Sequence, residues 1–240
     1  MADLEQRLLD WYAVEGRGLP WRRTRDPYAI LVSEVMLQQT QVERVVPRYV
    51  RWLERWPTAA YMAAAPRSEV IREWQGLGYN RRAVNLQRAA ERIAESGWPD
   101  DLTELAGVGR YTADAVARFA MEADILPVDV NVARVLDRTE GRFGPASAHA
   151  LMDLGARVCL ARVPRCGACP LADECPSRGR RYEPLRKQGR FEGSFRQLRA
   201  QTLRLVAERA RPAADLDGEA VAALARDGLV RLDDGLVRLP

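Results

Sequence analysis

Apolar residues recur every three or four positions from the N-terminus to Arg138, and glycine and proline interrupt this pattern at short intervals. The pattern predicts a compact array of short helices with little strand. We expect helices over 2–14, 28–38, 41–55, 58–64, 67–75, 80–96, 101–106, 110–121 and 130–138.

The C-terminal part of the chain has a different pattern. Residues 177–211 carry eleven Arg or Lys against three acids, which favours either a solvated linker or an extended nucleic-acid track. A short helix at 218–226 then precedes two copies of Gly-Leu-Val-Arg-Leu, at 228–232 and 235–239. Alternating apolar residues on either side of an Asp-Asp-Gly turn predict a β-hairpin, and a helix followed by a hairpin resembles a small winged helix.

Composition restricts the chemistry. Of the 37 basic residues, Lys187 is the single lysine, and His149 is the single histidine. Covalent amine chemistry therefore falls to Lys187 or the N-terminal amine, and a His-rich metal site is excluded. With a net charge of only +4, any nucleic-acid footprint must be local. There is no apolar signal core and no apolar run long enough to span a bilayer, so we expect neither export nor a membrane span.

The four cysteines lie within residues 159–175 of an otherwise Cys-free chain, at the spacing C-x6-C-x2-C-x5-C. Such clustering favours a metal over disulfides, and hence a reducing cytoplasmic compartment. Four thiolates on one loop can hold tetrahedral zinc or a [4Fe–4S] cluster, and spacing alone leaves both open. Arg162 and Arg165, on the first part of the loop, are placed to contact a phosphate.

Two glycines, Gly107 and Gly109, separate a short helix from a longer one that begins at Arg110. Glycine permits a tight turn and a close approach, and the free N–H groups of the next helix favour an anion. Such a helix–hairpin–helix binds a DNA phosphate without reading sequence. Asp129 follows a short distance further along the chain, just after the helix predicted at 110–121, which strengthens this interpretation.

Six motifs occur in a fixed order: residues 33–40 (SEVMLQQT), 76–79 (GLGY), 107–109 (GVG), 128–129 (VD), 151–156 (LMDLGA) and the cysteine cluster. Over about residues 17–176 the chain resembles the endonuclease III superfamily of DNA glycosylases, closest to its adenine-specific mismatch and mismatch thymine branches. The resemblance implies an all-α fold, with a six-helix barrel over 27–129. It implies a cluster domain formed by 1–26 and 130–180, leaving 181–240 as a basic linker and small extension.

The resemblance also implies a cofactor, a partner and site residues. It implies a [4Fe–4S] cluster on Cys159, Cys166, Cys169 and Cys175, and duplex DNA with one mispaired nucleotide flipped out. Expected DNA contacts are Gln38, Gln39, Thr40, Leu77, Tyr79, Gly107, Gly109, Arg110, Arg162 and Arg165. Expected base-pocket residues are Arg17, Leu19, Trp21, Arg22, Asn131 and His149, although His149 also suits a purely structural role. We expect a monomer, cytoplasmic and associated with the nucleoid.

Two carboxylates suit cleavage of an N-glycosidic bond, whose oxocarbenium-like transition state needs a nearby anion and a proton donor. Glu34 lies in an apolar helix, where burial would raise its pKa; the alternative is a surface glutamate. Asp129 precedes a helix and can cap it, which is the alternative to catalysis. By resemblance, Asp129 stabilises the sugar cation and Glu34 handles the proton.

Family members that also cut the strand carry a lysine in the hairpin, where it forms a Schiff base with the sugar. Here that position is Tyr111. We therefore assign Glu34, Asp129 and Tyr111 to the catalytic set and expect hydrolysis by water, leaving an abasic site without strand cleavage.

The base that is removed is harder to assign. Four departures speak against adenine: no long C-terminal domain, Val130 where that branch has Gly, Asn80 where it often has Tyr, and a short span between Arg138 and Cys159. We therefore favour thymine or uracil opposite guanine, with adenine opposite guanine or 8-oxoguanine as the alternative. Distant alternatives are a non-catalytic iron–sulfur DNA-binding protein and a structural zinc module.

Overall fold

The computed structural model describes residues 2–141, 143–183 and 189–240. The chain divides into two compact units. Unit 1 contains residues 1–27 and 110–187, and unit 2 contains residues 28–109 and 188–240. The boundaries expected from the resemblance stay a prediction; here the segment 110–129 groups with the cysteine loop. Among the described residues, no helix combines the length and apolar character needed to cross a bilayer.

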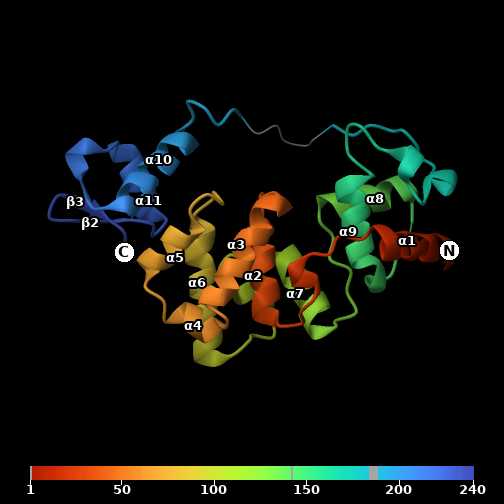
Figure 1. Ribbon diagram of the computed structural model, residues 1–240, viewed down its shortest axis with the longest axis horizontal. Coiled ribbons are helices and arrows are strands. Elements are labelled where there is room, and N and C mark those ends of the chain that lie inside the picture. The colour runs from red at the N-terminus through yellow and green to blue at the C-terminus, as the bar shows by residue number, and fades with distance from the viewer. Residues whose placement is uncertain (1, 142, 184–188) are drawn as a thin grey trace. The chain divides into compact units, whose positions relative to one another are not determined.

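Over its described residues, unit 1 consists of four helices and several short 3-10 turns (Figure 1). Its helices are α1 (Ala2–Glu15), α7 (Arg110–Met121), α8 (Val130–Thr139) and α9 (Ala148–Arg157). One apolar core joins α1, α8 and α9, where Leu8 of α1 packs with Val135 of α8 and Leu151 of α9. The N-terminal helix is thus part of the unit that carries the cysteines.

Gly155 of the LMDLGA motif explains how closely α8 and α9 pack. A Cβ at this position would lie 2.9 Å from the backbone oxygen of Asn131. Any larger residue would therefore force the two helices apart.

Unit 2 contains five helices of its N-terminal part, which pack around a tryptophan cluster. They are α2 (Pro27–Leu37), α3 (Val42–Arg55), α4 (Ala59–Ala63), α5 (Arg67–Trp74) and α6 (Arg81–Ser96). Trp52 packs edge-on against Trp56 and Trp74 at 4.6 and 5.4 Å between ring centroids. Helix α2 is buried from Tyr28 to Met36, as expected for a helix that is apolar on every side.

The same unit contains the C-terminal module, which we define as residues 189–240. It consists of α10 (Phe195–Glu208), β1 (Arg211–Pro212), α11 (Gly218–Arg226), β2 (Arg231–Asp233) and β3 (Leu236–Arg238). The strands form an antiparallel sheet in the order β1-β3-β2. Asp234 and Gly235 both have positive φ, 51° and 74°, which is the two-residue hairpin turn that the sequence predicts.

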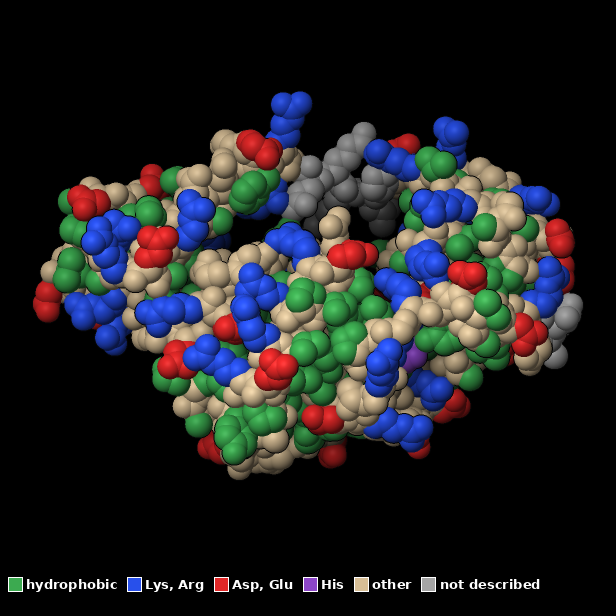
Figure 2. All heavy atoms as spheres, viewed as in Figure 1, with side chains coloured by type: hydrophobic (Ala, Val, Ile, Leu, Met, Phe, Trp, Pro, Cys, Tyr) green, Lys and Arg blue, Asp and Glu red, His purple; other side chains and the backbone are tan. Residues whose placement is uncertain are grey.

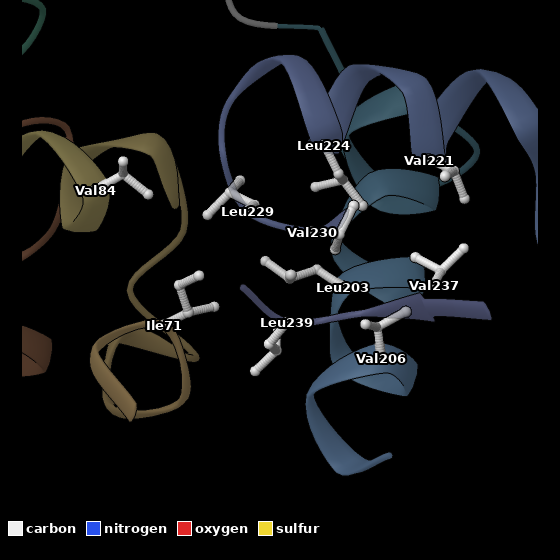
Figure 3. Packing of buried hydrophobic residues seen from close by; sticks show 10 residues of the cluster. All are labelled: Ile71, Val84, Leu203, Val206, Val221, Leu224, Leu229, Val230, Val237 and Leu239. Carbon is white, nitrogen blue, oxygen red and sulfur yellow. The ribbon is translucent and has the colours of Figure 1, made fainter. Parts of the chain in front are cut away.

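The C-terminal module shares its core with the helices of the N-terminal part (Figure 3). Ile71 of α5 and Val84 of α6 point into the apolar side chains of the module. Their partners are Leu203, Val206, Val221, Leu224, Leu229, Val230, Val237 and Leu239. Since each fully buried aliphatic side chain contributes about 1.5–3 kcal/mol, this shared core fixes the module on α5 and α6.

The expected elements agree with the structure over most of the chain, and three differences stand out. The segment 101–106 forms only a 3-10 turn at Leu102–Glu104, capped by the Asp101 carboxylate. Helix α9 has no counterpart among the predicted helices. Helix α10 lies inside the basic stretch for which a linker was one interpretation.

The distribution of charge bears on the alternative of an extended nucleic-acid track. On the face shown in Figure 2, basic side chains are scattered over both units among acidic ones, with no single basic field. This agrees with the low net charge and with a footprint that is local.

Candidate active site

Two loops of unit 2 carry side chains that are expected to enter DNA. Gln39 follows α2 and Tyr79 precedes α6, and both side chains are exposed. Both backbones have positive φ, 55° and 47°. This left-handed conformation is unfavourable for residues other than glycine and persists only where surrounding contacts hold it.

Arg82, on α6, supplies those contacts and was not among the predicted site residues. It is only 9% exposed, and its guanidinium joins the end of α2 to the loop before α6. It donates to the carbonyls of Val35 (2.7 Å), Met36 (3.0 Å), Leu77 (3.3 Å) and Gly78 (3.0 Å) and to the Thr40 hydroxyl (3.0 Å). Burial lowers the pKa of Arg82 to about 10, so it remains charged at neutral pH.

Leu77 is buried, whereas the resemblance implies that it contacts DNA. Its side chain is 3% exposed, so it belongs to the core, and the loop uses its carbonyl as an acceptor for Thr40 and Arg82. Thr40 and Gln38 are half-buried, and the Gln38 amide lies 3.5 Å from the Gly107 carbonyl. The Gln38–Thr40 loop therefore reaches the glycine hairpin within unit 2.

The glycine hairpin needs glycine at one of its two positions. Gly107 has φ 79°, and a Cβ there would lie 2.8 Å from the Asn85 Cβ. Gly109 has no atom within 4 Å of the place where its Cβ would stand, so this side of the hairpin is open to an approaching ligand. Helix α7 begins directly after it at Arg110, which is exposed and pairs with Asp114 at 2.9 Å. Tyr111 is half-buried in the first turn.

Glu34 lies in the buried part of α2. Its side chain is 6% exposed, and every residue from Tyr28 to Met36 around it is buried. The alternative of a surface glutamate therefore does not apply. The role of Glu34 in transferring a proton to or from the base stays a prediction.

Asp129 caps α8 and is held from both oxygens. Oδ1 accepts from the backbone N–H groups of Asn131 (2.9 Å) and Val132 (2.7 Å), and Oδ2 accepts from Asn131 Nδ2 (2.9 Å). Arg134 in turn donates to Asn131 Oδ1 (2.8 Å) and to the Cys159 carbonyl (2.8 Å). The carboxylate orientation is thus tied to the cysteine loop, and Asn131 acts here as its positioning residue.

Unit 1 also contains a cavity of about 320 Å³, at the lower end of the range of small-ligand sites. Three predicted base-pocket residues, Trp21, Arg22 and His149, line it. Arg17, Leu19 and Asn131 are not among its lining residues. The prediction missed Phe119, whose ring stacks on His149 at 4.1 Å between centroids. The remaining lining residues are Thr24, Arg25, Arg118, Glu122, Pro145, Ala146 and Ala148.

Asp153 of the LMDLGA motif anchors two of the predicted arginines. Its side chain is fully buried and accepts from Arg17 Nε (2.8 Å) and from Arg22 Nη1 (2.9 Å) and Nη2 (2.7 Å). Although burial opposes the charge, these hydrogen bonds lower the pKa of Asp153 to about 2. Arg22 is therefore fixed at the cavity wall by a charge that persists at physiological pH.

His149 is neutral at physiological pH. Burial, followed by the charge of Arg22, lowers its pKa to about 4. A neutral imidazole has one donor and one acceptor nitrogen, a pair that suits the edge of a nucleobase.

This lowered pKa predicts a pH dependence of stability. The unfolded chain takes up the proton near pH 6.5 and the folded chain near pH 4, so the free energy of unfolding falls as the pH drops through this window. We expect His149→Gln, which cannot titrate, to reduce the loss between pH 7 and pH 5 by about 2 kcal/mol. Urea unfolding at both pH values measures it, and equal losses in the two proteins would contradict it. The Asp153 carboxyl titrates below this pH range and is present in both proteins, so it does not affect the comparison.

The four cysteines lie together in unit 1. Cys159, Cys166, Cys169 and Cys175 line one cavity, and no disulfide joins them. Burial raises the pKa of Cys169 to about 11, although a backbone hydrogen bond at Leu171 lowers it. Arg138 donates to Cys159 Sγ at 3.1 Å. Among the described residues, no three His, Cys, Asp or Glu side chains are arranged so that they could hold a metal ion. The chemistry of the four cysteines nevertheless fits a group bound by four thiolates.

The arginines of the cysteine loop are exposed. Arg165 lies just before Cys166, and Arg162 is 3.5 Å from the Glu183 carboxylate. Both side chains are exposed, and their contact with a phosphate stays a prediction. Lys187, the single lysine, lies outside the described residues.

Comparison with known proteins assigns the class. The family model described as "HhH-GPD superfamily base excision DNA repair protein" matches residues 32–154. The fold is similar to that of a thermostable thymine-DNA glycosylase, with a TM-score of 0.66, 26% identity and coverage of 73% of this chain and 94% of the other. An endonuclease III–DNA covalent intermediate has the same fold, with a TM-score of 0.63, 23% identity and coverage of 73% and 93%.

The chain therefore belongs to the HhH-GPD superfamily, within the endonuclease III class of helical DNA glycosylases. It is a DNA-binding base-excision repair glycosylase. The adenine DNA glycosylase of Mycolicibacterium smegmatis is 41% identical over 237 residues, covering 85% of this chain and 80% of that protein. The human adenine DNA glycosylase is 38% identical over 227 residues, covering 78% of this chain and 42% of the human protein.

Proposed function

We propose that the protein is a monofunctional adenine DNA glycosylase that removes adenine opposite guanine or 8-oxoguanine from duplex DNA, acting as a monomer. The observation that carries this proposal is the similarity to adenine DNA glycosylases across 85% of the chain. The sequence favoured thymine or uracil opposite guanine, a preference that the relatives do not confirm; they fit the adenine alternative better.

The reaction replaces the bond between the base nitrogen and the sugar C1′ with a bond from C1′ to a water oxygen. As the bond lengthens, positive charge develops on the sugar and negative charge on the base. We propose that Asp129, oriented by its cap and by Asn131, stabilises the sugar. Glu34, buried in α2, would deliver a proton to the departing adenine and recover one from the attacking water.

The proposal that the strand stays uncut rests on the residue in the hairpin. A Schiff base needs an amine at C1′, and the hairpin position used for it in strand-cutting relatives is Tyr111. Lys187 is far from the hairpin in sequence, beyond the cysteine loop. We propose that water is the nucleophile and that the product is an intact strand with an abasic site.

The proposed cofactor is a [4Fe–4S] cluster held by Cys159, Cys166, Cys169 and Cys175. Four thiols that line one cavity support it, and a cluster bound there supplies rigidity and redox chemistry rather than a group that reacts with the base. The hydrogen bond from Arg134 to the Cys159 carbonyl links the cysteine loop to Asp129 through Asn131. Folding of this loop is thus expected to orient the carboxylate.

The base preference is tested with four duplexes that differ in one pair: G·A, 8-oxoguanine·A, G·T and G·U. With enzyme in excess over DNA, we expect excision only of adenine, because the similar proteins over most of the chain are adenine DNA glycosylases. The neutral His149 and fixed Arg22 in the cavity offer donors and an acceptor to the edge of that base. His149→Gln is the matched variant and should lower the excision rate without creating activity on thymine. Release of thymine or uracil at a comparable rate would contradict the proposal.

A further inference from the structure

The C-terminal module contacts the N-terminal end of α6, which directly follows the Tyr79 loop. Asp227, after α11, pairs with Arg199 of α10 and lies 3.6 Å from the guanidinium of Arg81, the first residue of α6. Arg72 of α5 donates to the Ala207 carbonyl at 3.0 Å. Together with the shared core, these contacts hold the start of α10 and the loop before α6 on the same side of unit 2 (Figure 1).

The segment that leads into α10 exposes two aromatic rings. Phe191 is 47% exposed and Phe195 is 40% exposed. Phe191 and Phe195 lie only four residues apart in the segment that leads into α10. Exposing two large apolar side chains so close in sequence is unfavourable in water, which makes this segment a candidate for a binding role. Phe195 lies one helical turn before Arg199, so this surface adjoins the Asp227 contact with α6.

Hydrogen bonds hold this segment in place. Arg196 donates to the Gly189 carbonyl at 2.7 Å, and the Ser194 hydroxyl donates to the Phe191 carbonyl at 2.6 Å. The Gly193 N–H donates to the Gln197 side chain at 2.7 Å. The rings are therefore presented by an ordered turn, which reduces the entropy lost when a ligand binds.

The charge of this surface favours a polyanion. Residues 189–199 contain three arginines against the single acid Glu192. Arg190 is exposed, whereas Arg196 and Arg199 are engaged within the module. Aromatic rings beside an arginine suit nucleic acid, since rings pack on the apolar faces of bases and sugars while arginine pairs with phosphate.

We propose that residues 189–196 form a second DNA-contacting surface, which binds the same duplex as the Tyr79 loop and extends the footprint beyond the mispair. The proposal rests on the proposed function only in taking the Tyr79 loop as a DNA contact. Phe191 and Phe195 pack against bases or sugars, and Arg190 pairs with one phosphate.

Binding of the full-length protein to a fluorescent duplex with one 8-oxoguanine·A pair tests this. The double variant Phe191→Ala/Phe195→Ala is expected to weaken binding about tenfold, equivalent to about 1.4 kcal/mol. Arg190→Ala, whose site is too exposed to disturb folding, is expected to lower the slope of log K against log salt by about 0.9. Matched controls in the same module are Leu232→Ala, at an exposed apolar residue of β2, and Arg209→Ala, beyond the end of α10.

Wild-type affinity and salt slope in the Phe191, Phe195 and Arg190 variants would overturn the proposal, and so would equal losses in the controls. Excision at saturating enzyme should change less than twofold, because these residues do not touch the reacting atoms. A failure of adenine excision in the wild-type protein would instead count against the proposed function, and the binding comparison would stand without it.

Discussion

Replacing Asp129 with asparagine is expected to lower the single-turnover rate of adenine excision about a thousandfold or more, while DNA affinity and stability stay close to wild type. Asparagine caps helices as well as aspartate does, so the bonds to the Asn131 and Val132 N–H groups can persist. What is lost is the negative charge beside the sugar cation, and preorganised charges of this kind account for large parts of enzymatic rate enhancement. The variant thereby separates catalysis from capping.

Glu34→Gln is the companion variant and is expected to lose excision by a factor of about 10²–10⁴, the range for a positioned general acid or base. Glutamine fills the same buried volume, so the apolar packing of α2 is retained. Excision by both variants at wild-type rates would show that these two carboxylates do not carry the chemistry. Only a wild-type protein that binds the duplex and releases no base would restore the alternative of a non-catalytic DNA-binding protein. Rates measured with enzyme in excess, together with binding to uncleavable DNA, distinguish lost chemistry from lost affinity.

Arg82→Ala is expected to lower the free energy of unfolding by about 3–5 kcal/mol, because it leaves several buried carbonyls without a donor at once. Those carbonyls belong to the end of α2 and to the loop before α6. Loss of their shared donor also frees Gln39 and Tyr79 from their left-handed backbones, so DNA affinity should fall as well.

Arg82→Lys should recover little of this stability, since one ammonium cannot reach both groups of acceptors that the planar guanidinium spans. The matched control is Arg92→Ala, at an exposed position of the same helix, expected to change stability by less than about 0.5 kcal/mol. Urea unfolding compares the three proteins. Equal stability of Arg82→Ala and Arg92→Ala would show that Arg82 does not hold the two loops.

Much of the fold follows from the local sequence pattern. The parts that do not follow from it depend on long-range packing. The helices predicted between positions 2 and 96 carry apolar stripes that are buried in the structure. Helix α10 is hard to predict from the sequence because arginines interrupt its apolar positions. In the structure its apolar face is defined by Leu203 and Val206, which pack with Ile71 and Val84. Helix α9 contains a known motif, but the glycine and the buried aspartate in it weakened its helical pattern.

The candidate site divides in the same way. Glu34, Asp129, the glycine hairpin and the cysteines could be found because each has a local signature. Arg82, Arg134 and Asp153 could not, because their importance comes from partners distant in sequence. The sequence contains only weak indications of two of these residues. They are an arginine shortly after Asn131 and a lone aspartate inside the apolar LMDLGA motif. His149 was identified as a candidate, but its partner Phe119 was not.

The central claim is that this chain hydrolyses adenine from a mispair and leaves the strand uncut. The most direct measurement uses a duplex with one 8-oxoguanine·A pair, labelled on the adenine strand, with each reaction divided into an alkali-treated and an untreated half. We expect a cleaved strand only after alkali, because Tyr111 stands where a Schiff-base lysine would be needed. Equal cleavage in the untreated half, or an adenine strand that survives alkali, would contradict it.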